Sequence, residues 1–238
     1  MNTANLIARF ENELGKVNRP GMDKLLAYIR QSDFYTAPAS TKYHLSCEGG
    51  LLQHSLNVLD ALRDLLVESP VSGNWEYMVA GRIVDEIPAD SVILMALLHD
   101  ICKTYFYTTS WRNAKNEQTG KWEKVPFFAV KDRMPLGHGD KSVMMIKQYI
   151  SLTTKEMYAI WWHMGFTDGT DARTLNNALT MYPIIWALHT ADMMASNMME
   201  EESGNKAAFV DPEPTSAGEW ADQDTEPQFE EAPAYGTD

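Results

Sequence analysis

Histidine and aspartate side chains embedded in apolar segments constrain this fold more than any other feature of the sequence. His99 and Asp100 follow seven consecutive apolar residues, Val92 to Leu98, and Asp192 lies within the apolar sequence PIIWALHTADMMA. Burying a carboxylate is costly unless it is paired, hydrogen-bonded or bound to a cation. The chain must therefore bring these polar groups together or let them reach solvent at a helix end.

Three further histidines lie in comparable surroundings. His54 falls on the apolar stripe of a helical pattern, His163 lies in IWWHMG, and His138 lies between glycines in LGHGD. Each of them alone is explained as a buried histidine whose ring nitrogens find hydrogen-bond partners. Together with the carboxylates, however, they form the ligand set that divalent transition metals prefer. Their repeated occurrence favours a shared metal site.

Apolar residues at helical spacing extend over most of the chain. They predict helices at 4–17, 22–32, 50–68, 75–84, 89–101, 140–150, 154–163, 172–180 and 182–200. The segments 104–113 and 122–131 are instead rich in aromatic, Thr and Val residues and flank the sequence NEQTG, which predicts a β-hairpin. We therefore expect an all-α helical bundle over 1–200, with one β-hairpin inserted at about 104–131, followed by an acidic tail over 201–238.

Charge is distributed unevenly along the 238 residues. The net charge is −13, and 201–238 contain eleven Asp or Glu against one Lys, a net of −10 that leaves about −3 for the first 200 residues. A segment of this composition is expected to be solvated. Its aromatic residues offer an alternative, in which the tail is anchored to the domain or to a partner subunit. These residues are Phe209, Trp220, Phe229 and Tyr235.

The middle of the chain has the opposite bias. Residues 103–147 contain nine Lys or Arg and four Asp or Glu, a local net of +5. Such a stretch indicates either an anion-facing surface or a solvated loop. In the first case the candidate phosphate contacts are Arg112, Lys115, Lys131 and Arg133, with Tyr105, Tyr107, Trp111, Trp122, Phe127 and Phe128 in the substrate pocket. In the second case the hairpin is a surface decoration.

The remaining composition indicates a cytoplasmic protein. Two cysteines, Cys47 and Cys102, are too few for a disulfide framework and fit a reducing compartment. The N-terminal sequence lacks the pattern of a secretory signal, and the apolar runs are much shorter than the ~20 residues that span a membrane. We therefore expect no membrane partner.

The ordered segments PASTKYHLSCEGGLLQHSLNVL, ALLHDICK, GHGDKS, IWWHMG and ALHTADMMAS carry a resemblance to a known family. Their order of His, His-Asp, His, His and Asp resembles the HD-domain metal-dependent phosphohydrolases, in the branch that holds two metal ions. The resemblance covers residues 38–196, about two thirds of the chain. The HD region of bacterial exoribonucleases that act from the 3′ end is the most similar, because it opens with a comparable Pro-Ala … His … GGLL-x-His stretch.

The resemblance implies a role for each polar residue. One ion is held by His54, His99, Asp100 and Asp192, and the second by His138 and His163, with Asp100 shared between the ions. Lys103 contacts a phosphate oxygen, although a solvated lysine at a helix end is an alternative. His44 contacts substrate or is structural, and His189 replaces His138 as a ligand if His138 is too distant.

The implied activity is hydrolysis of a phosphoester or phosphodiester in a small nucleotide-type substrate by water activated at two divalent ions, of Mn, Fe, Mg, Ni or Co. Three departures from the family pattern bear on the substrate. Cys102 stands where Gly is common, Met164 where a second His is common, and about forty residues precede the HD region where the exoribonucleases carry an OB-type domain. The alternatives are a 3′–5′ exonuclease on short RNA or single-stranded DNA, and a catalytically idle ligand sensor. A homo-oligomer is compatible with each.

Overall fold

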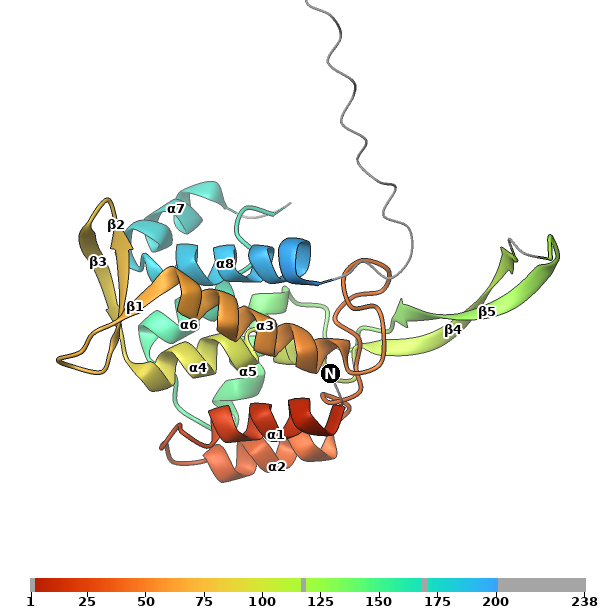
Figure 1. Ribbon diagram of the computed structural model, residues 1–238, viewed down its shortest axis with the longest axis horizontal. Coiled ribbons are helices and arrows are strands. Elements are labelled where there is room, and N and C mark those ends of the chain that lie inside the picture. Colours follow the sequence, from red (N-terminus) through yellow and green to blue (C-terminus); the bar gives the residue numbers. More distant parts are fainter. Residues whose placement is uncertain (1–2, 117–118, 168–170, 201–238) are drawn as a thin grey trace, which may run out of the picture. The chain divides into compact units, whose positions relative to one another are not determined.

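The computed structural model describes residues 3–116, 119–167 and 171–200, and it combines helices with two small antiparallel sheets (Figure 1). About 49% of the described residues are helical and 17% lie in strands. The prediction of an all-α fold is therefore wrong, because the chain is a mixed α/β protein. The predicted acidic tail over 201–238, with its four aromatic residues, lies outside the described residues.

The helices follow the predicted segments closely, with one exception described below. They are α1 (Thr3–Leu14), α2 (Met22–Gln31), α3 (Gly50–Leu65), α4 (Ala89–Leu98), α5 (His138–Lys147), α6 (Thr154–Trp161), α7 (Ala172–Met181) and α8 (Ile184–Met194). A 3-10 turn, η1 (Ile101–Lys103), follows α4, and a π-helical turn, η2 (Ala195–Met199), follows α8. Among the described residues, none of the helices is both long enough and apolar enough to cross a membrane.

The exception is the helix predicted at 75–84, which is wrong. This segment forms β2 (Trp75–Val79) and β3 (Arg82–Ile87), and β1 (Leu66–Glu68) pairs with β2 to complete a three-stranded sheet. Ala80 and Gly81 have φ angles of 50° and 75°. Positive φ at both central residues is the geometry of a two-residue hairpin turn that matches the twist of the flanking strands. Short apolar runs of this kind do not distinguish helix from strand by their spacing alone.

The second sheet confirms the predicted hairpin. It consists of β4 (Tyr107–Lys115) and β5 (Trp122–Val130), which pair continuously from Tyr107↔Val130 to Lys115↔Trp122. Figure 1 shows this hairpin extending away from the helices of its own unit. Its outer residues consequently have few neighbours and stay exposed.

The core is built around α3, which packs against α4 and α8. All of Val92 to Leu98 in α4 are buried, so this helix is enclosed on every side. At the start of α3, a Cβ on Gly50 would lie 2.1 Å from the carbonyl oxygen of Leu45. Only glycine permits this approach, which holds the preceding loop, with His44, against the N-terminal end of α3.

An ion-pair network around the buried side chain of Glu156 joins the loop after α1 to the N-terminal ends of α4 and α6. The guanidinium of Arg19 donates to both carboxylate oxygens of Glu156, at 2.6 and 2.8 Å, and to Asp90 at 2.8 Å. The hydroxyl of Ser91 and the backbone N–H of Thr153 also donate to Glu156. We call these five residues the Arg19 network, and its charges are paired within the protein.

Candidate metal centre

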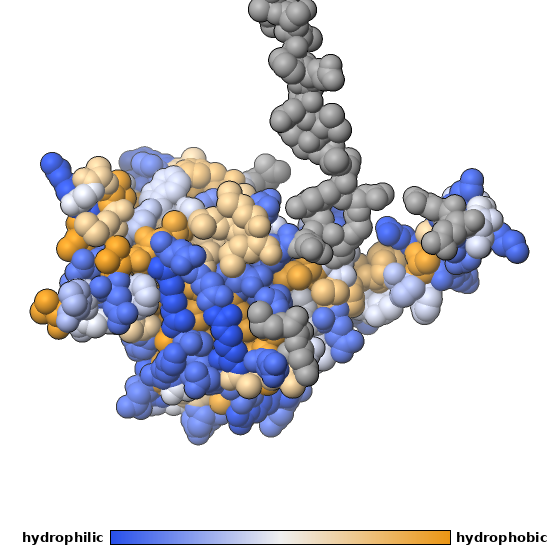
Figure 2. Space-filling model, viewed as in Figure 1, coloured by the Kyte–Doolittle hydropathy of each residue, from blue (hydrophilic) through white to orange (hydrophobic). Residues whose placement is uncertain are grey.

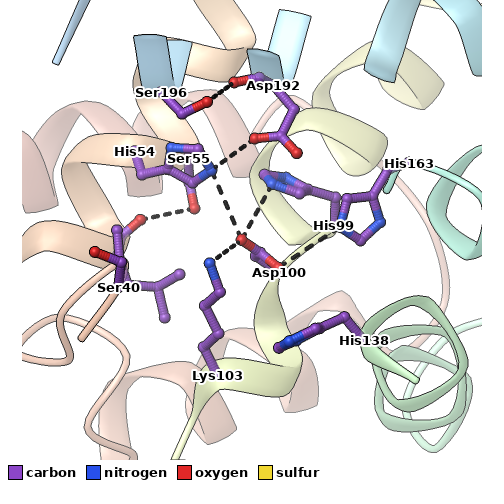
Figure 3. Close-up of polar contacts among 12 residues, drawn as sticks. Ser40, His54, Ser55, His99, Asp100, Lys103, His138, His163, Asp192 and Ser196 are labelled. Carbon is purple, nitrogen blue, oxygen red and sulfur yellow. Dashed lines mark hydrogen bonds and ion pairs between the residues drawn. The ribbon is translucent and has the colours of Figure 1, made fainter. Parts of the chain in front are cut away.

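Five predicted ligands from four separate segments point toward one another (Figure 3). His54 comes from α3, His99 and Asp100 from the end of α4, His163 from just after α6, and Asp192 from α8. All are buried except Asp192, whose side chain keeps 16% of its exposure. We call these five residues the central cluster.

The distances within the central cluster are those of groups that share one space. Asp100 Oδ2 lies 3.6 Å from His54 Nε2 and 3.4 Å from His99 Nε2, and Asp100 Oδ1 lies 3.7 Å from His163 Nε2. Asp192 Oδ1 lies 3.2 Å from His54 Nε2. The predicted association of these residues is therefore present in the structure.

Local backbone contacts orient two of the imidazoles. His99 Nδ1 donates to the carbonyl oxygen of Ala96 at 2.9 Å, and His163 Nδ1 donates to that of Ile160 at 2.6 Å. Because a carbonyl only accepts, the proton of each neutral ring lies on Nδ1 and the lone pair lies on Nε2. Both lone pairs consequently face the carboxylates, as metal-ligating histidines require.

The inward-facing ring nitrogens lack hydrogen-bond partners. Nε2 of His54, His99 and His163 are buried atoms with no hydrogen bond among the described residues, although carboxylate oxygens lie within 4 Å of them. An unsatisfied buried polar atom costs about 1–3 kcal/mol. A divalent cation satisfies such lone pairs and carboxylates simultaneously, so this set of donors fits a metal ion.

Electrostatics keep the two carboxylates ionised. Burial raises the pKa of Asp100, but the ammonium of Lys103, 2.6 Å away, and the ring of His99 outweigh burial and hold the pKa well below its usual range. Burial likewise opposes the lowered pKa of Asp192, which follows from contact with His54. Both side chains are therefore anionic acceptors at neutral pH.

The same contacts act on the cationic partners. Burial lowers the pKa of His54, but the facing carboxylates of Asp192 and Glu200 raise it to about 9, so a metal ion binding at Nε2 would displace a proton from this ring. Burial also lowers the pKa of Lys103, and Asp100 more than compensates, so that Lys103 stays protonated. Lys103 is thus directed at Asp100 from η1 and not into solvent, because its side chain is only 13% exposed.

His138 lies at the edge of the central cluster, at the first position of α5 (Figure 3). A Cβ on Gly139 would lie 2.0 Å from the carbonyl oxygen of Trp161, so glycine lets α5 approach the end of α6. His138 Nδ1 lies 3.3 Å from Sγ of Cys102, and these two residues group with Asp100 within 4.8 Å. His163 groups instead with His99 and Asp192. Cys102 is therefore a potential ligand that the sequence analysis treated only as a departure.

Glu200 is a second functional candidate that sequence reasoning missed. Its side chain is fully buried and accepts hydrogen bonds from His54 Nδ1 at 3.0 Å and from Asn57 at 2.9 Å. It also lies 3.9 Å from Nε2 of His44, whose ring is 5.1 Å from that of His54. A carboxylate on Nδ1 fixes the orientation of a metal-ligating imidazole. The spacing pattern could not single it out from the neighbouring Glu201 and Glu202, because a π-helical turn precedes it.

The predicted phosphate contacts do not join the central cluster in the described residues. Arg112 and Lys115 are exposed on β4, and Lys131 is exposed just after β5. Arg133 lines a separate cavity of about 240 Å³ with Cys102 and Lys141. His189, the alternative ligand, donates from Nδ1 to the carbonyl oxygen of His163 at 2.7 Å. His189 therefore holds the backbone of His163 in place through this hydrogen bond.

Known protein families, curated proteins and solved structures provide no match to this chain. The geometry of the central cluster and the sequence resemblance described above are therefore what support a function.

Proposed function

We propose that this protein is a metal-dependent phosphohydrolase of the HD type, which cleaves a phosphoester of a nucleotide-type substrate. The observation that carries the proposal is the convergence of three buried Nε2 atoms, without hydrogen bonds in the described part of the chain, on two ionised carboxylates. Buried polar atoms of structural ion pairs are in most cases hydrogen-bonded.

The proposed ligands follow from the side chains at hand. The resemblance implies that one divalent ion would be held by His54, His99, Asp100 and Asp192, and a second by His138 and His163 with Asp100 shared. In the structure His163 lies with His99 and Asp192, and His138 lies with Asp100 and Cys102, so that Cys102 would be a further ligand of the second ion. Such ions, when bound, neutralise phosphoryl oxygens and supply hydroxide near neutral pH from bound water. The compatible ions are those predicted from the sequence, Mn, Fe, Mg, Ni or Co.

Lys103 has a distinct part in the proposal. Its ammonium lies 2.6 Å from Asp100 and remains protonated because the carboxylate stabilises its charge. A protonated lysine beside the ligands would donate a charge-assisted hydrogen bond to a non-bridging phosphate oxygen of the substrate. It would thereby orient the phosphorus atom and stabilise the negative charge that develops during attack.

The proposal is tested by hydrolysis of bis-p-nitrophenyl phosphate and p-nitrophenyl phosphate after removal and defined return of Mn²⁺ or Fe²⁺. The wild type should release p-nitrophenol only with metal, and Asp100→Asn should lose at least ~100-fold of kcat/KM, more than outer-shell substitutions usually cost. Asp60→Asn is the matched control, because Asp60 also pairs with a cation, Arg9, but on the outer side of α3. Equal rates with and without every metal, or in Asp100→Asn and wild type, would contradict the proposal.

A further inference from the structure

The two faces of the β4–β5 hairpin differ in chemistry. Residues paired directly across an antiparallel ladder point to the same side, and alternate residues along a strand share that side. One side therefore carries Tyr107, Thr109, Trp111, Asn113 and Lys115 from β4 with Trp122, Lys124, Pro126, Phe128 and Val130 from β5. We call this side the aromatic face, and it contains aromatic residues and lysines but no Asp or Glu.

The tryptophans of the aromatic face are not part of the core. Trp111 is 63% exposed and Trp122 is 72% exposed, whereas the core aromatics Phe10 and Phe34 are fully buried. The two tryptophans are separated by roughly 13 Å along the hairpin, from four residues at the usual strand rise. Large apolar rings held in water on a regular strand indicate a binding surface more than a folding element.

The charge of the hairpin complements an anion. Residues 107–130 contain Arg112, Lys115, Lys121 and Lys124 against two glutamates, a net of +2 in a chain of net charge −13. The glutamate of the described residues, Glu123, lies on the opposite face and accepts from Asn116. Figure 2 shows hydrophilic residues at the outer end of the hairpin and hydrophobic residues nearer the helices.

A cavity lies between the base of the hairpin and the loop before α3. Its volume is about 430 Å³, and Thr41, Lys42 and Ser46 line it from the loop. From the hairpin it is lined by Thr109, Pro126 and Phe128 of the aromatic face and by Arg112 and Phe127 of the opposite face. His44 lies in the same loop, and its ring centroid is 5.1 Å from that of His54. At the base of the hairpin, Tyr107 donates to the carbonyl oxygen of Ala39 at 3.1 Å, which fixes hairpin and loop together.

From this arrangement we infer that the aromatic face and the cavity bind a single strand of nucleic acid and direct its end toward the central cluster. Bases stack on Trp111 and Trp122, because every base has a π-face, and phosphates lie near Lys115, Lys124 and Lys42. Cleavage of the bound strand rests on the proposed function. There, water would add to phosphorus and the P–O bond would break, which releases a nucleoside monophosphate and a strand one nucleotide shorter. Binding along the hairpin does not depend on that step.

Fluorescence anisotropy with fluorescein-labelled oligo(dT) and oligo(U) of twelve nucleotides, in EDTA, measures binding without cleavage. The Trp111→Ala/Trp122→Ala variant should bind at least ~10-fold more weakly, since each base–aromatic stack contributes about 1–3 kcal/mol. Trp111→Phe/Trp122→Phe should restore most of the affinity, which shows that stacking and not folding was lost. Trp186→Ala, which removes another exposed tryptophan from α8, is the matched control and should bind as the wild type does.

Salt dependence tests the lysines separately. Lys115→Gln/Lys124→Gln should lower the slope of log K against log salt by roughly 1.4, the value expected when two phosphate contacts to a single strand are lost. An unchanged slope, or equal affinity in wild type and the tryptophan double variant, would overturn the inference. So would a wild type that does not bind either oligonucleotide.

Two further outcomes separate this inference from its alternatives. If the hairpin serves a second copy of the chain, the tryptophan variant will dissociate a dimer in sedimentation without weakening oligonucleotide binding, which overturns the inference. Asp100→Asn should bind the strand while losing phosphodiester hydrolysis. If the protein hydrolyses bis-p-nitrophenyl phosphate but does not bind a strand, this inference alone is wrong. If it binds a strand but shows no metal-dependent hydrolysis, the proposed function alone is wrong.

Discussion

The Arg19 network and the central cluster are both groups of charged side chains around a buried carboxylate, but only the first satisfies its own hydrogen bonds. Arg19 and Glu156 form a bidentate pair, and each carboxylate oxygen also accepts a second hydrogen bond, from Thr153 at the start of α6 or from Ser91. The central cluster instead leaves three imidazole nitrogens without hydrogen bonds within the described residues. Under the proposed function, the difference separates a group that stabilises the fold from one that binds a metal ion.

Shifted pKa values do not make this distinction. The carboxyl groups of both Glu156 and Asp100 have lowered pKa values, in each case because a nearby cation outweighs the effect of burial. Structural ion pairs and functional sites both perturb titration. The ring nitrogens without hydrogen bonds are therefore the informative feature. Substitutions in the Arg19 network should lower stability, and substitutions in the central cluster should lower metal affinity.

The largest effect on stability is expected from Glu156→Gln. Removing the carboxylate charge leaves the half-buried guanidinium of Arg19 with Asp90 as its remaining ionic partner, which should lower the free energy of unfolding by about 3 kcal/mol, the lower end of the cost of breaking a buried pair. Urea denaturation followed by circular dichroism measures this change. The affinity of the variant for Mn²⁺ should remain that of the wild type, and a parallel loss of metal affinity would erase the distinction between the two groups.

Metal addition should produce the next largest effect. Mn²⁺ at 100 times its Kd should stabilise the wild type by about 2.7 kcal/mol, because it binds the folded state alone. Thermal unfolding at increasing Mn²⁺ concentration tests this expectation. His99→Ala should abolish the increase in Tm with Mn²⁺. Glu156→Gln should show the same increase from a lower starting Tm. A wild type whose Tm does not change with Mn²⁺, Fe²⁺, Ni²⁺ or Co²⁺ would count against a metal site.

Glu200→Gln should have a smaller effect, confined to the central cluster. The amide oxygen can still accept from His54 Nδ1 without the negative charge, so metal affinity should fall about 10–100-fold. Competition with a coloured chelator measures the affinity. Glu11→Gln is a control, because Glu11 pairs with Arg30 on the surface. If Glu200→Gln binds the metal as tightly as the wild type does, the charge of Glu200 has no part in metal binding.

The smallest effect concerns acid stability. The pKa of Glu156 is lower in the folded protein than its ordinary value of 4.5. Its stabilising contribution is therefore complete above that value and is lost as the pH falls through the folded pKa. Between pH 5 and pH 3 the free energy of unfolding should fall more steeply in the wild type than in Glu156→Gln. Parallel curves for the two proteins would contradict this assignment.

Much of the fold and the grouping of the central cluster could be predicted, because both depend on the spacing of apolar residues. His54 and Asp192 were recognisable as polar side chains on buried helical faces, and the hairpin at β4–β5 had a long β-rich pattern on both sides of its turn. The hairpin of β2 and β3 was missed because five- and six-residue runs around Ala80 and Gly81 match either periodicity.

The rest of the site depends on distances that spacing does not encode. Glu200 reaches His54 from beyond a π-helical turn, and Cys102 meets His138 only after α5 approaches η1. Local charge likewise identified Arg112 as a candidate phosphate contact. It did not predict the position of this side chain, which lies on the hairpin over the ring of Phe127.

Metal stoichiometry tests the central claim most directly. Wild type, Glu156→Gln and Asp100→Asn should be stripped of metal, equilibrated by dialysis against Mn²⁺ and analysed by elemental mass spectrometry. We predict about two equivalents per chain in the first two proteins, as expected for a two-metal centre, and a loss of bound metal in Asp100→Asn. Background levels in the wild type, or equal metal content in Asp100→Asn, would contradict the account.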